Sequence, residues 1–271
     1  MESIREPAVA GTFYPASPSH LKELIHGYLE ETRPEAGIKS LAGIVSPHAG
    51  YVYSGKTAAY AYGTIDKQYD TVIILSPSHR EYFAGISIFS GEAYKTPLGT
   101  VPVNKLIREQ LVHNSKNIFA GFDGHRNEHA IEVQIPFLQV ILRDFTVVPI
   151  VIGDQRRSFI DELAFKLAEA VDDKTLIIAS SDLSHFFPSG EADKLDERIE
   201  KNIAGFDYES LMKDLESGKC EACGGGAIVA MMKTADIIEK RKSRVLARTN
   251  SGDVTGDYSE VVGYLSAAVY G

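Results

Sequence analysis

The sequence has few cysteines, no long apolar run and no surplus of positive charge. Its two cysteines, Cys220 and Cys223, form one C-x-x-C pair, and no second pair exists to complete a four-cysteine zinc site. Three roles of this pair remain open: a redox dithiol, a disulfide, or a thiolate that acts as a ligand or nucleophile. No apolar stretch approaches the roughly 20 residues of a membrane span, and the N-terminus lacks the layout of a signal peptide. We therefore expect a soluble, cytosolic protein without a membrane partner.

The charge balance is acidic, which argues against a nucleic-acid partner. The chain carries 37 Asp and Glu against 28 Lys and Arg, giving a formal net charge of −9. Contact with phosphates needs a basic face instead. With 271 residues, 44% of them hydrophobic, and no low-complexity tract or Pro/Ser linker, the chain is predicted to form one domain over residues 1–271.

Three apolar runs stop at a polar break that leads to a histidine. The histidines are His48, His79 and His185, and the breaks are Ser-Pro twice and Ser-Ser-Asp once. Continuous aliphatic runs suit strands covered on both faces, and ligands of open α/β sheets gather beyond the carboxyl ends of the strands. The β–α alternation predicts a single-domain α/β/α sandwich with a mixed, largely parallel central sheet. We expect the three imidazoles to share one site at its edge.

His48 and His79 are the natural pair of metal ligands, because both follow Ser-Pro breaks at the same edge of the sheet. Neutral imidazole is the commonest protein metal ligand, and two histidines with one anionic ligand are typical of non-haem iron(II) enzymes. Cys223 is a candidate third ligand, since it precedes three glycines at a predicted helix start, where the helix dipole favours a thiolate. Its spacing alone favours a small buried cysteine instead.

Two further groups stand near these histidines in the sequence. Asp182 and His185 could form a base with its orienting carboxylate, or Asp182 could simply cap a turn. Tyr51 and Tyr53, which follow His48, are candidate pocket walls or proton donors, although aromatic residues near a sheet edge more often pack.

A polar cluster lies between the second and third of these histidines. It could bind a metal if its members shared one helix face, but the H-E-x-x-H motif is absent, and the pattern favours a solvated or core-bordering face. The cluster consists of His125, Glu128, His129 and Glu132.

With these residues assembled, the sequence resembles the Memo family, named for a mediator of receptor-driven cell motility. The resemblance covers almost the whole length. The family in turn resembles class III extradiol (LigB-type) dioxygenases, whose non-haem iron sits in an α/β fold. The motifs that carry the resemblance are REPAVAGTFYP at 5–15, SPHAGYVYSG at 46–55, SPSH at 76–79, EHAIE at 128–132, SSDLSH at 180–185 and Cys223-Gly224.

The resemblance implies a role for each matching residue. His48 and His79 match the family's two metal-binding histidines, and Cys223 matches its cysteine ligand. His185 matches the acid/base histidine of the dioxygenases, with Asp182 beside it. Aromatic positions of the same cleft are matched by Tyr53 and by Phe13, which stands where the animal proteins have tryptophan. We predict that Tyr53 is a catalytic residue together with His185 and Asp182, and that Phe13 and Tyr51 line the substrate cleft.

The predicted cofactor is one metal ion, and iron is the first choice. Copper and zinc are alternatives, because a soft thiolate replaces the dioxygenase carboxylate. The predicted function is oxygen-dependent redox chemistry on a small molecule. One alternative is a binding module that recognises a peptide or a partner protein in the same cleft. Another is a metal-assisted hydrolase with His185 as base. Family members occur beside radical-SAM and AMMECR-type proteins in prokaryotes, which makes these expected partners.

Overall fold

The fold is organised around one sheet of nine strands. The structure is a computed structural model and describes residues 4–32 and 37–271. The strand order is β10-β12-β2-β9-β3-β8-β4-β7, and β11 also pairs with β12. The nine strands are β2 (Leu41–Ser46), β3 (Thr71–Pro77), β4 (Ile86–Phe89), β7 (Ile118–Gly121), β8 (Thr146–Ile152), β9 (Thr175–Ser180), β10 (His185–Phe187), β11 (Lys242–Asn250) and β12 (Val261–Tyr270).

The four central strands, β2, β9, β3 and β8, run parallel, so their carboxyl ends meet at one edge. On either side, β12 and β4 pair antiparallel with β2 and β8. The prediction of a mixed, largely parallel sheet is therefore confirmed. Because β9 lies between β2 and β3, the chain that leaves β9 emerges between the segments that carry His48 and His79.

The continuous apolar runs are explained by cover on both faces of the sheet. Successive side chains of a strand point to opposite faces. Ile44 and Ile74 accordingly belong to one core layer, whereas their neighbours Val45 and Ile73 belong to the other. All four side chains are fully buried. The two core layers thus share the sheet, as in an α/β/α sandwich.

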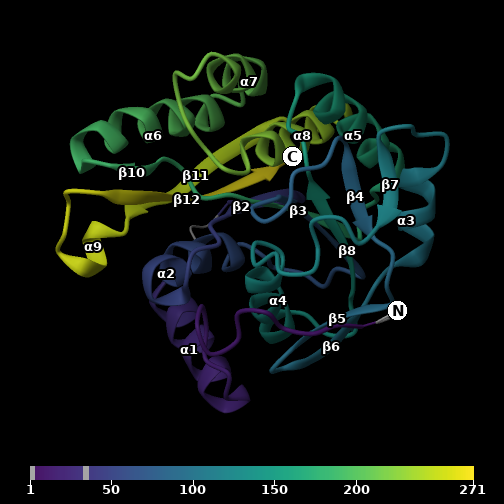
Figure 1. The fold of residues 1–271 in the computed structure, drawn as a ribbon, viewed down its shortest axis with the longest axis horizontal. Helices are drawn as coiled ribbons and strands as arrows, with labels where there is room; N and C mark the ends of the chain where they lie inside the picture. Colours follow the sequence, from purple (N-terminus) through teal and green to yellow (C-terminus); the bar gives the residue numbers. More distant parts are fainter. Residues whose placement is uncertain (1–3, 33–36) are drawn as a thin grey trace.

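Helices form a layer on each face of the sheet (Figure 1). Helices α1, α2 and α4 cover one face, and α5, α6, α7 and α8 cover the other. None of the described helices combines the length and apolar character needed to cross a membrane. The helices are α1 (Pro18–Glu31), α2 (Tyr51–Tyr62), α3 (Lys105–Val112), the 3₁₀ turn η1 (Glu132–Gln134), α4 (Ile135–Ile141), α5 (Arg157–Ala170), α6 (Ser189–Ala204), α7 (Tyr208–Glu216), α8 (Gly225–Ile237) and α9 (Gly252–Thr255).

A small second sheet holds the N-terminal segment in place. Strand β1 (Ile4–Arg5) pairs parallel with β5 (Ala93–Thr96), which forms a hairpin with β6 (Gly99–Pro102). From β1 the buried side chain of Arg5 reaches Glu132 at the start of η1. The N-terminal segment is therefore joined to the stretch of chain that also carries Glu128 and His129.

Candidate metal centre

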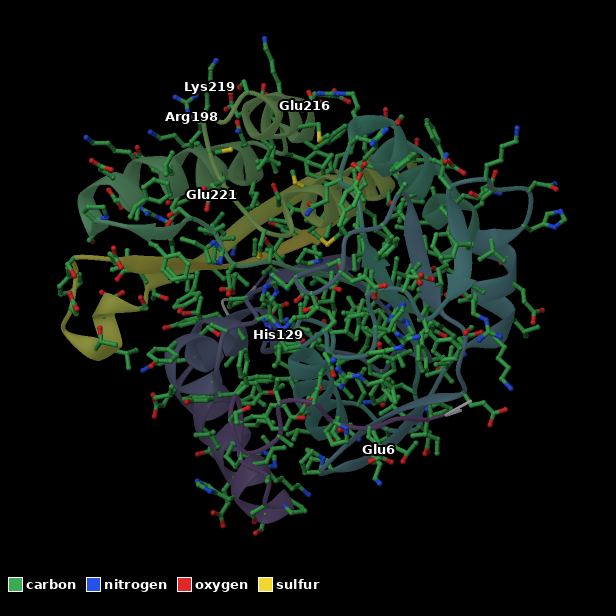
Figure 2. The ribbon with its side chains drawn as sticks, in the orientation of Figure 1. Glu6, His129, Arg198, Glu216, Lys219 and Glu221 are labelled. Atoms are coloured by element: carbon green, nitrogen blue, oxygen red, sulfur yellow. The ribbon has the colours of Figure 1, made fainter. Side chains whose placement is uncertain are left out.

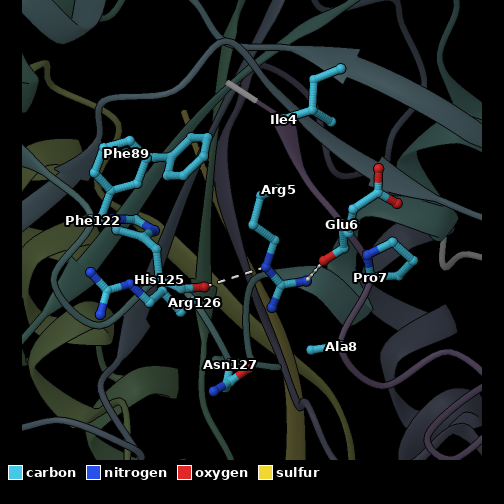
Figure 3. Close-up of a pocket in the computed structure, with 10 residues that line it drawn as sticks. All are labelled: Ile4, Arg5, Glu6, Pro7, Ala8, Phe89, Phe122, His125, Arg126 and Asn127. Carbon is cyan, nitrogen blue, oxygen red and sulfur yellow. Dashed lines mark hydrogen bonds between the residues drawn. The ribbon is translucent and has the colours of Figure 1, made fainter. Parts of the chain in front are cut away.

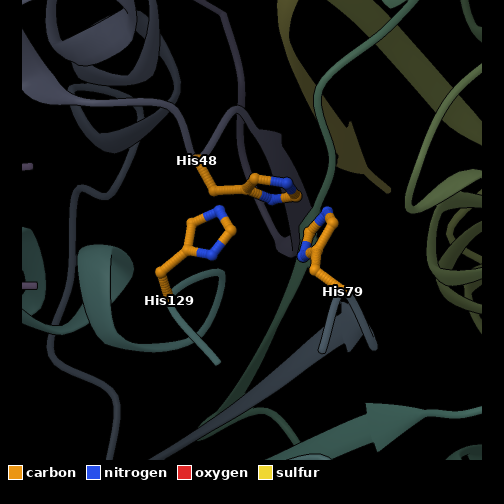
Figure 4. Close-up of side chains that lie close together, drawn as sticks. All are labelled: His48, His79 and His129. Atoms are coloured by element: carbon orange, nitrogen blue, oxygen red, sulfur yellow. The ribbon is translucent and has the colours of Figure 1, made fainter. Parts of the chain in front are cut away.

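Three imidazoles from three separate segments face one another. His48 lies two residues past β2, His79 two residues past β3, and His129 in the loop before η1 (Figure 4). One nitrogen from each ring lies within 4.8 Å of the others. Nitrogen ligands about 2.0–2.1 Å from a tetrahedral ion stand about 3.4 Å apart, so a bound ion would draw the rings slightly together. The geometry suits a group that holds one metal ion.

His48 is buried, and its surroundings fix which ring nitrogen carries the hydrogen. Its Nδ1 lies 2.9 Å from Ser180 Oγ. Ser180 Oγ donates its only hydrogen to the Ala130 carbonyl oxygen at 2.7 Å and accepts from Nε2 of Gln134 at 2.8 Å. Nδ1 of His48 must therefore be the donor, which leaves the lone pair on Nε2. Burial, with His79 nearby, lowers the pKa of His48 to about 3, so the ring is neutral near pH 7.

Glu128 determines which ring nitrogen of His79 carries the hydrogen. Its buried carboxylate accepts from Nδ1 of His79 at 2.9 Å and from the His79 backbone N–H at 2.7 Å. It also accepts the backbone N–H groups of His129 and Ala130, each at 2.9 Å. Burial raises the pKa of Glu128, but the hydrogen bonds from His79 and Ala130 outweigh burial and bring it to about 2. An ionised carboxylate on Nδ1 leaves Nε2 of His79 free, as in carboxylate–histidine–metal sites.

His129 completes the group from the loop that precedes η1. Burial lowers its pKa to about 4, so this ring is neutral too. Its Nδ1 lies 3.3 Å from Oε1 of Glu128 but outside hydrogen-bond geometry, and this buried atom has no hydrogen-bond partner among the described residues. A buried polar atom without a partner costs free energy. A metal ion is one partner that would remove this cost, so the donor set fits a cation.

Cys223 lies against the histidines at the start of α8. Its Sγ stands 3.2 Å from Nε2 of His48 and accepts from the backbone N–H of Asp182 at 3.3 Å. A Cβ at Gly224 would come within 2.3 Å of the Ser180 carbonyl oxygen, so glycine is required for α8 to begin this close to β9. Burial, with the Asp182 carboxylate beside it, raises the pKa of the thiol, against the thiolate expected from the helix dipole.

Both cysteines are free, so the C-x-x-C pair forms no disulfide here. Cys220 is buried, and burial raises its pKa to about 11. A thiolate at Cys223 therefore needs a cation beside it, and the thiol is placed to meet one bound by the three histidines. Its role as a metal ligand stays a prediction.

Asp182 and His185 contact different parts of the site. Oδ1 of Asp182 accepts from the backbone N–H of His48 at 2.7 Å, and Oδ2 lies 3.9 Å from Nε2 of His48. The ring of His185, at the start of β10, has Nδ1 3.6 Å from Glu221 and packs against Phe186. The structure thus brings Asp182 against His48, and the acid/base roles of Asp182 and His185 stay predictions.

The predicted catalytic Tyr53 and the two predicted cleft residues, Phe13 and Tyr51, have three different environments. The ring of Phe13 lies 4.8 Å from the ring of His129 and borders the histidine group. Tyr53 is 41% exposed and lines a separate cavity of about 310 Å³ at the molecular surface. Tyr51 is 4% exposed, donates to the Val133 carbonyl oxygen at 2.6 Å and packs in the core.

The four residues of the polar cluster, His125, Glu128, His129 and Glu132, have two different roles. His125 and Glu132 are buried structural residues, and the ring of His125 bonds to Tyr94 and to the Ser87 carbonyl oxygen. Glu128 and His129 instead join the histidine group. The expected core-bordering position therefore applies to His125 and Glu132, and His129, which the sequence indicated only as a member of this cluster, is a candidate ligand.

Comparisons with known proteins agree on the family and the fold. The family described as Memo-like protein matches residues 5–268. The MEMO1 family protein MJ0403 of Methanocaldococcus jannaschii is 37% identical over 99% of this chain and 100% of its own. The MEMO1 family protein TV1383 of Thermoplasma volcanium is 38% identical over 97% of each chain. The crystal structure of an uncharacterized protein, JW3007 from Escherichia coli K12, shares the fold at a TM-score of 0.53 and 14% identity, covering 84% of this chain and 99% of that one.

Proposed function

Since this chain belongs to the Memo-like protein family, and three of its histidines could bind a metal ion, we propose that it is a mononuclear metalloprotein that performs redox chemistry on a small molecule. The observation that carries the proposal is the convergence of His48, His79 and His129, with one nitrogen of each within 4.8 Å of the others. Iron is the proposed metal, with copper and zinc as alternatives.

The donor atoms favour a transition metal over magnesium or calcium. His48 and His79 each keep their hydrogen on Nδ1 and present Nε2, and Cys223 adds a sulfur 3.2 Å from one of these nitrogens. Nitrogen and sulfur ligands suit iron, copper and zinc, whereas magnesium and calcium prefer oxygen. A bound iron or copper ion would supply electron transfer and Lewis acidity at this edge of the sheet.

The residues around the histidines supply positioning and proton handling. Glu128 orients the ring of His79, and Phe13 covers one side of His129. Asp182 is buried with Oδ2 3.9 Å from Nε2 of His48, where a carboxyl group can hold a proton beside the substrate. His185 is more open to solvent and is the proposed route for protons to leave, with its side chain 27% exposed.

A second candidate function is metal-assisted hydrolysis, which the third histidine favours. Three histidines are one of the ligand sets that catalytic zinc sites use while keeping a position open for water. Activity on a small-molecule panel that persists without oxygen would support hydrolysis, and oxygen uptake tied to turnover would support redox chemistry. Both functions need the same three imidazoles.

The metal content of the purified protein tests the site itself. The protein is prepared without air from its own host, and the metal per chain is measured by mass spectrometry. We expect about one ion per chain in the wild type and at least a tenfold loss in the His48→Ala, His79→Ala double variant, because two of the three imidazoles are gone.

A double variant of exposed histidines, His20→Ala with His26→Ala on α1, is the matched control and should keep its metal. Circular dichroism checks that both variants fold. Undiminished metal in the folded His48/His79 variant would exclude this site and the proposed function with it.

A further inference from the structure

A cavity of about 550 Å³ lies apart from the histidine group (Figure 3). Residues 4–8 line one side, and Phe122 with residues 125–127 lines the other. Figure 2 shows Glu6, on the first side, well separated from His129. The lining includes none of the three clustered histidines and not Cys223. The volume falls within the range of about 300–1,000 Å³ found for small-molecule sites.

One part of this cavity is lined by aromatic and other apolar side chains. The rings of Phe89 and Phe122 meet edge to face, with centroids 5.4 Å apart. Phe89 is 2% exposed and is held by further ring contacts with Tyr94 and His125, so this wall is rigid. Ile4 and the ring of Pro7 stand on the opposite side (Figure 3). Aromatic faces and edges of this kind favour a planar apolar partner.

The charge of the lining is positive, although the chain as a whole carries −9. Arg126 is exposed and has no ion-pair or hydrogen-bond partner among the residues that the structure describes. The acidic side chain in the lining, Glu6, already pairs with Lys95 at 3.0 Å. The guanidinium of Arg126 is therefore the uncompensated charge of the cavity.

A second guanidinium stands in the middle of the lining (Figure 3). Arg5 is 5% exposed, and its N–H groups reach four oxygen acceptors. A guanidinium has five N–H groups, so one has no acceptor among the described residues. The four acceptors are the carbonyl oxygens of Glu6, His125 and Glu128 and the carboxylate of Glu132.

We propose that this cavity binds a small molecule in which one carboxylate is attached to a flat apolar body. The carboxylate would pair with Arg126, since a planar guanidinium matches a carboxylate through two parallel hydrogen bonds. The flat body would lie against Phe89 and Phe122. The site is distinct from the proposed metal centre and does not depend on the metal.

Benzoate and benzamide test the proposal, because they have the same size and shape and differ in charge. Each is titrated into the whole chain while amide NMR signals are followed. We expect saturable shifts at residues 4–6, at residue 8 and at residues 122–127, and benzoate binding about tenfold more tightly than benzamide. Arg126→Gln should remove that preference, whereas Arg143→Gln, which changes another exposed arginine outside the cavity lining, should keep it.

Other outcomes would overturn the proposal. Equal binding of benzoate and benzamide to the wild type would show that charge does not select the ligand. An unchanged preference in Arg126→Gln would remove the assigned guanidinium from the site. Shifts confined to the neighbourhood of His48, His79 and His129 would place the probe at the proposed metal centre instead.

Discussion

Two buried glutamates, Glu128 and Glu132, are four residues apart, and their carboxylates have different roles. Glu132 is fully buried, and its oxygens accept from Arg5, from the hydroxyl of Tyr14 and from the backbone N–H groups of Ala8 and Val9. These donors all belong to the N-terminal segment. Glu132 therefore attaches that segment to the chain before α4.

Glu128 is buried to nearly the same degree, but its oxygens accept from a ring that can bind a metal. Its donors are the ring and backbone N–H groups of His79 and the backbone N–H groups of His129 and Ala130. Burial and residue type are thus the same at the two positions. Glu132 acts as an anchor and Glu128 as an orienting group because their hydrogen-bond donors differ. The main difference is the permanent cation of Arg5, which faces only the carboxylate of Glu132.

The largest expected effect comes from Glu132→Gln. This change leaves the buried guanidinium of Arg5 without an anionic partner, and such uncompensated charges cost about 3–5 kcal/mol. The unfolding free energy, measured by urea titration, should fall by about that amount. The metal content of the folded fraction should stay near the wild-type value. A loss below about 1 kcal/mol would mean that the carboxylate does not anchor the segment.

Glu128→Gln should show the opposite pattern. No permanent cation faces this carboxylate, so the loss of stability should be smaller than for Glu132→Gln. A neutral amide holds the Nδ1 hydrogen of His79 less firmly, and changes of this kind typically lower metal affinity about 10–100-fold. Competition with a metal-binding dye measures the affinity. If Glu128→Gln lost stability without losing affinity, the two glutamates would have the same role.

The sequence contains enough information to predict the sheet. Ile44 and Val45, like Ile73 and Ile74, lie in unbroken apolar runs, and such runs have no solvent face. The polar breaks after these runs mark the carboxyl ends of parallel strands, where His48 and His79 meet. The periodicity of side chains along a strand and the rule for parallel sheets are local or general, so they can be read from one sequence.

The third histidine could not be predicted in the same way. His129 follows no strand, and its polar neighbours are typical of a solvated loop. Its place beside His48 depends on strand order and on the buried contacts of Glu128 and Glu132, which are long-range features. The raised pKa of Cys223 is another such feature, because burial and Asp182 outweigh the local helix dipole.

The smallest expected effect comes from Ser180→Ala, which tests whether a neutral hydroxyl can orient a histidine as Glu128 does. Ser180 Oγ accepts the Nδ1 hydrogen of His48 because its own hydrogen is already given to Ala130. Ser180→Ala removes this acceptor, so part of the His48 population should move its hydrogen to Nε2, where it blocks metal binding. We expect metal affinity to fall by several-fold, less than for Glu128→Gln, since a hydroxyl holds the hydrogen less strongly than a carboxylate.

Ring-nitrogen NMR of the metal-free protein reports the position of the hydrogen directly. In the wild type the nitrogen signals of His48 should show the hydrogen on Nδ1, and in Ser180→Ala they should shift toward an average of the two forms. Ser87→Ala is the matched control, because the hydroxyl of Ser87 is also buried but has no hydrogen-bond partner among the described residues. It should change neither the signals nor the affinity. If Ser180→Ala kept the wild-type signals, the hydroxyl would not determine which nitrogen of His48 carries the hydrogen. Of the two proposed orienting groups, only the carboxylate of Glu128 would then remain.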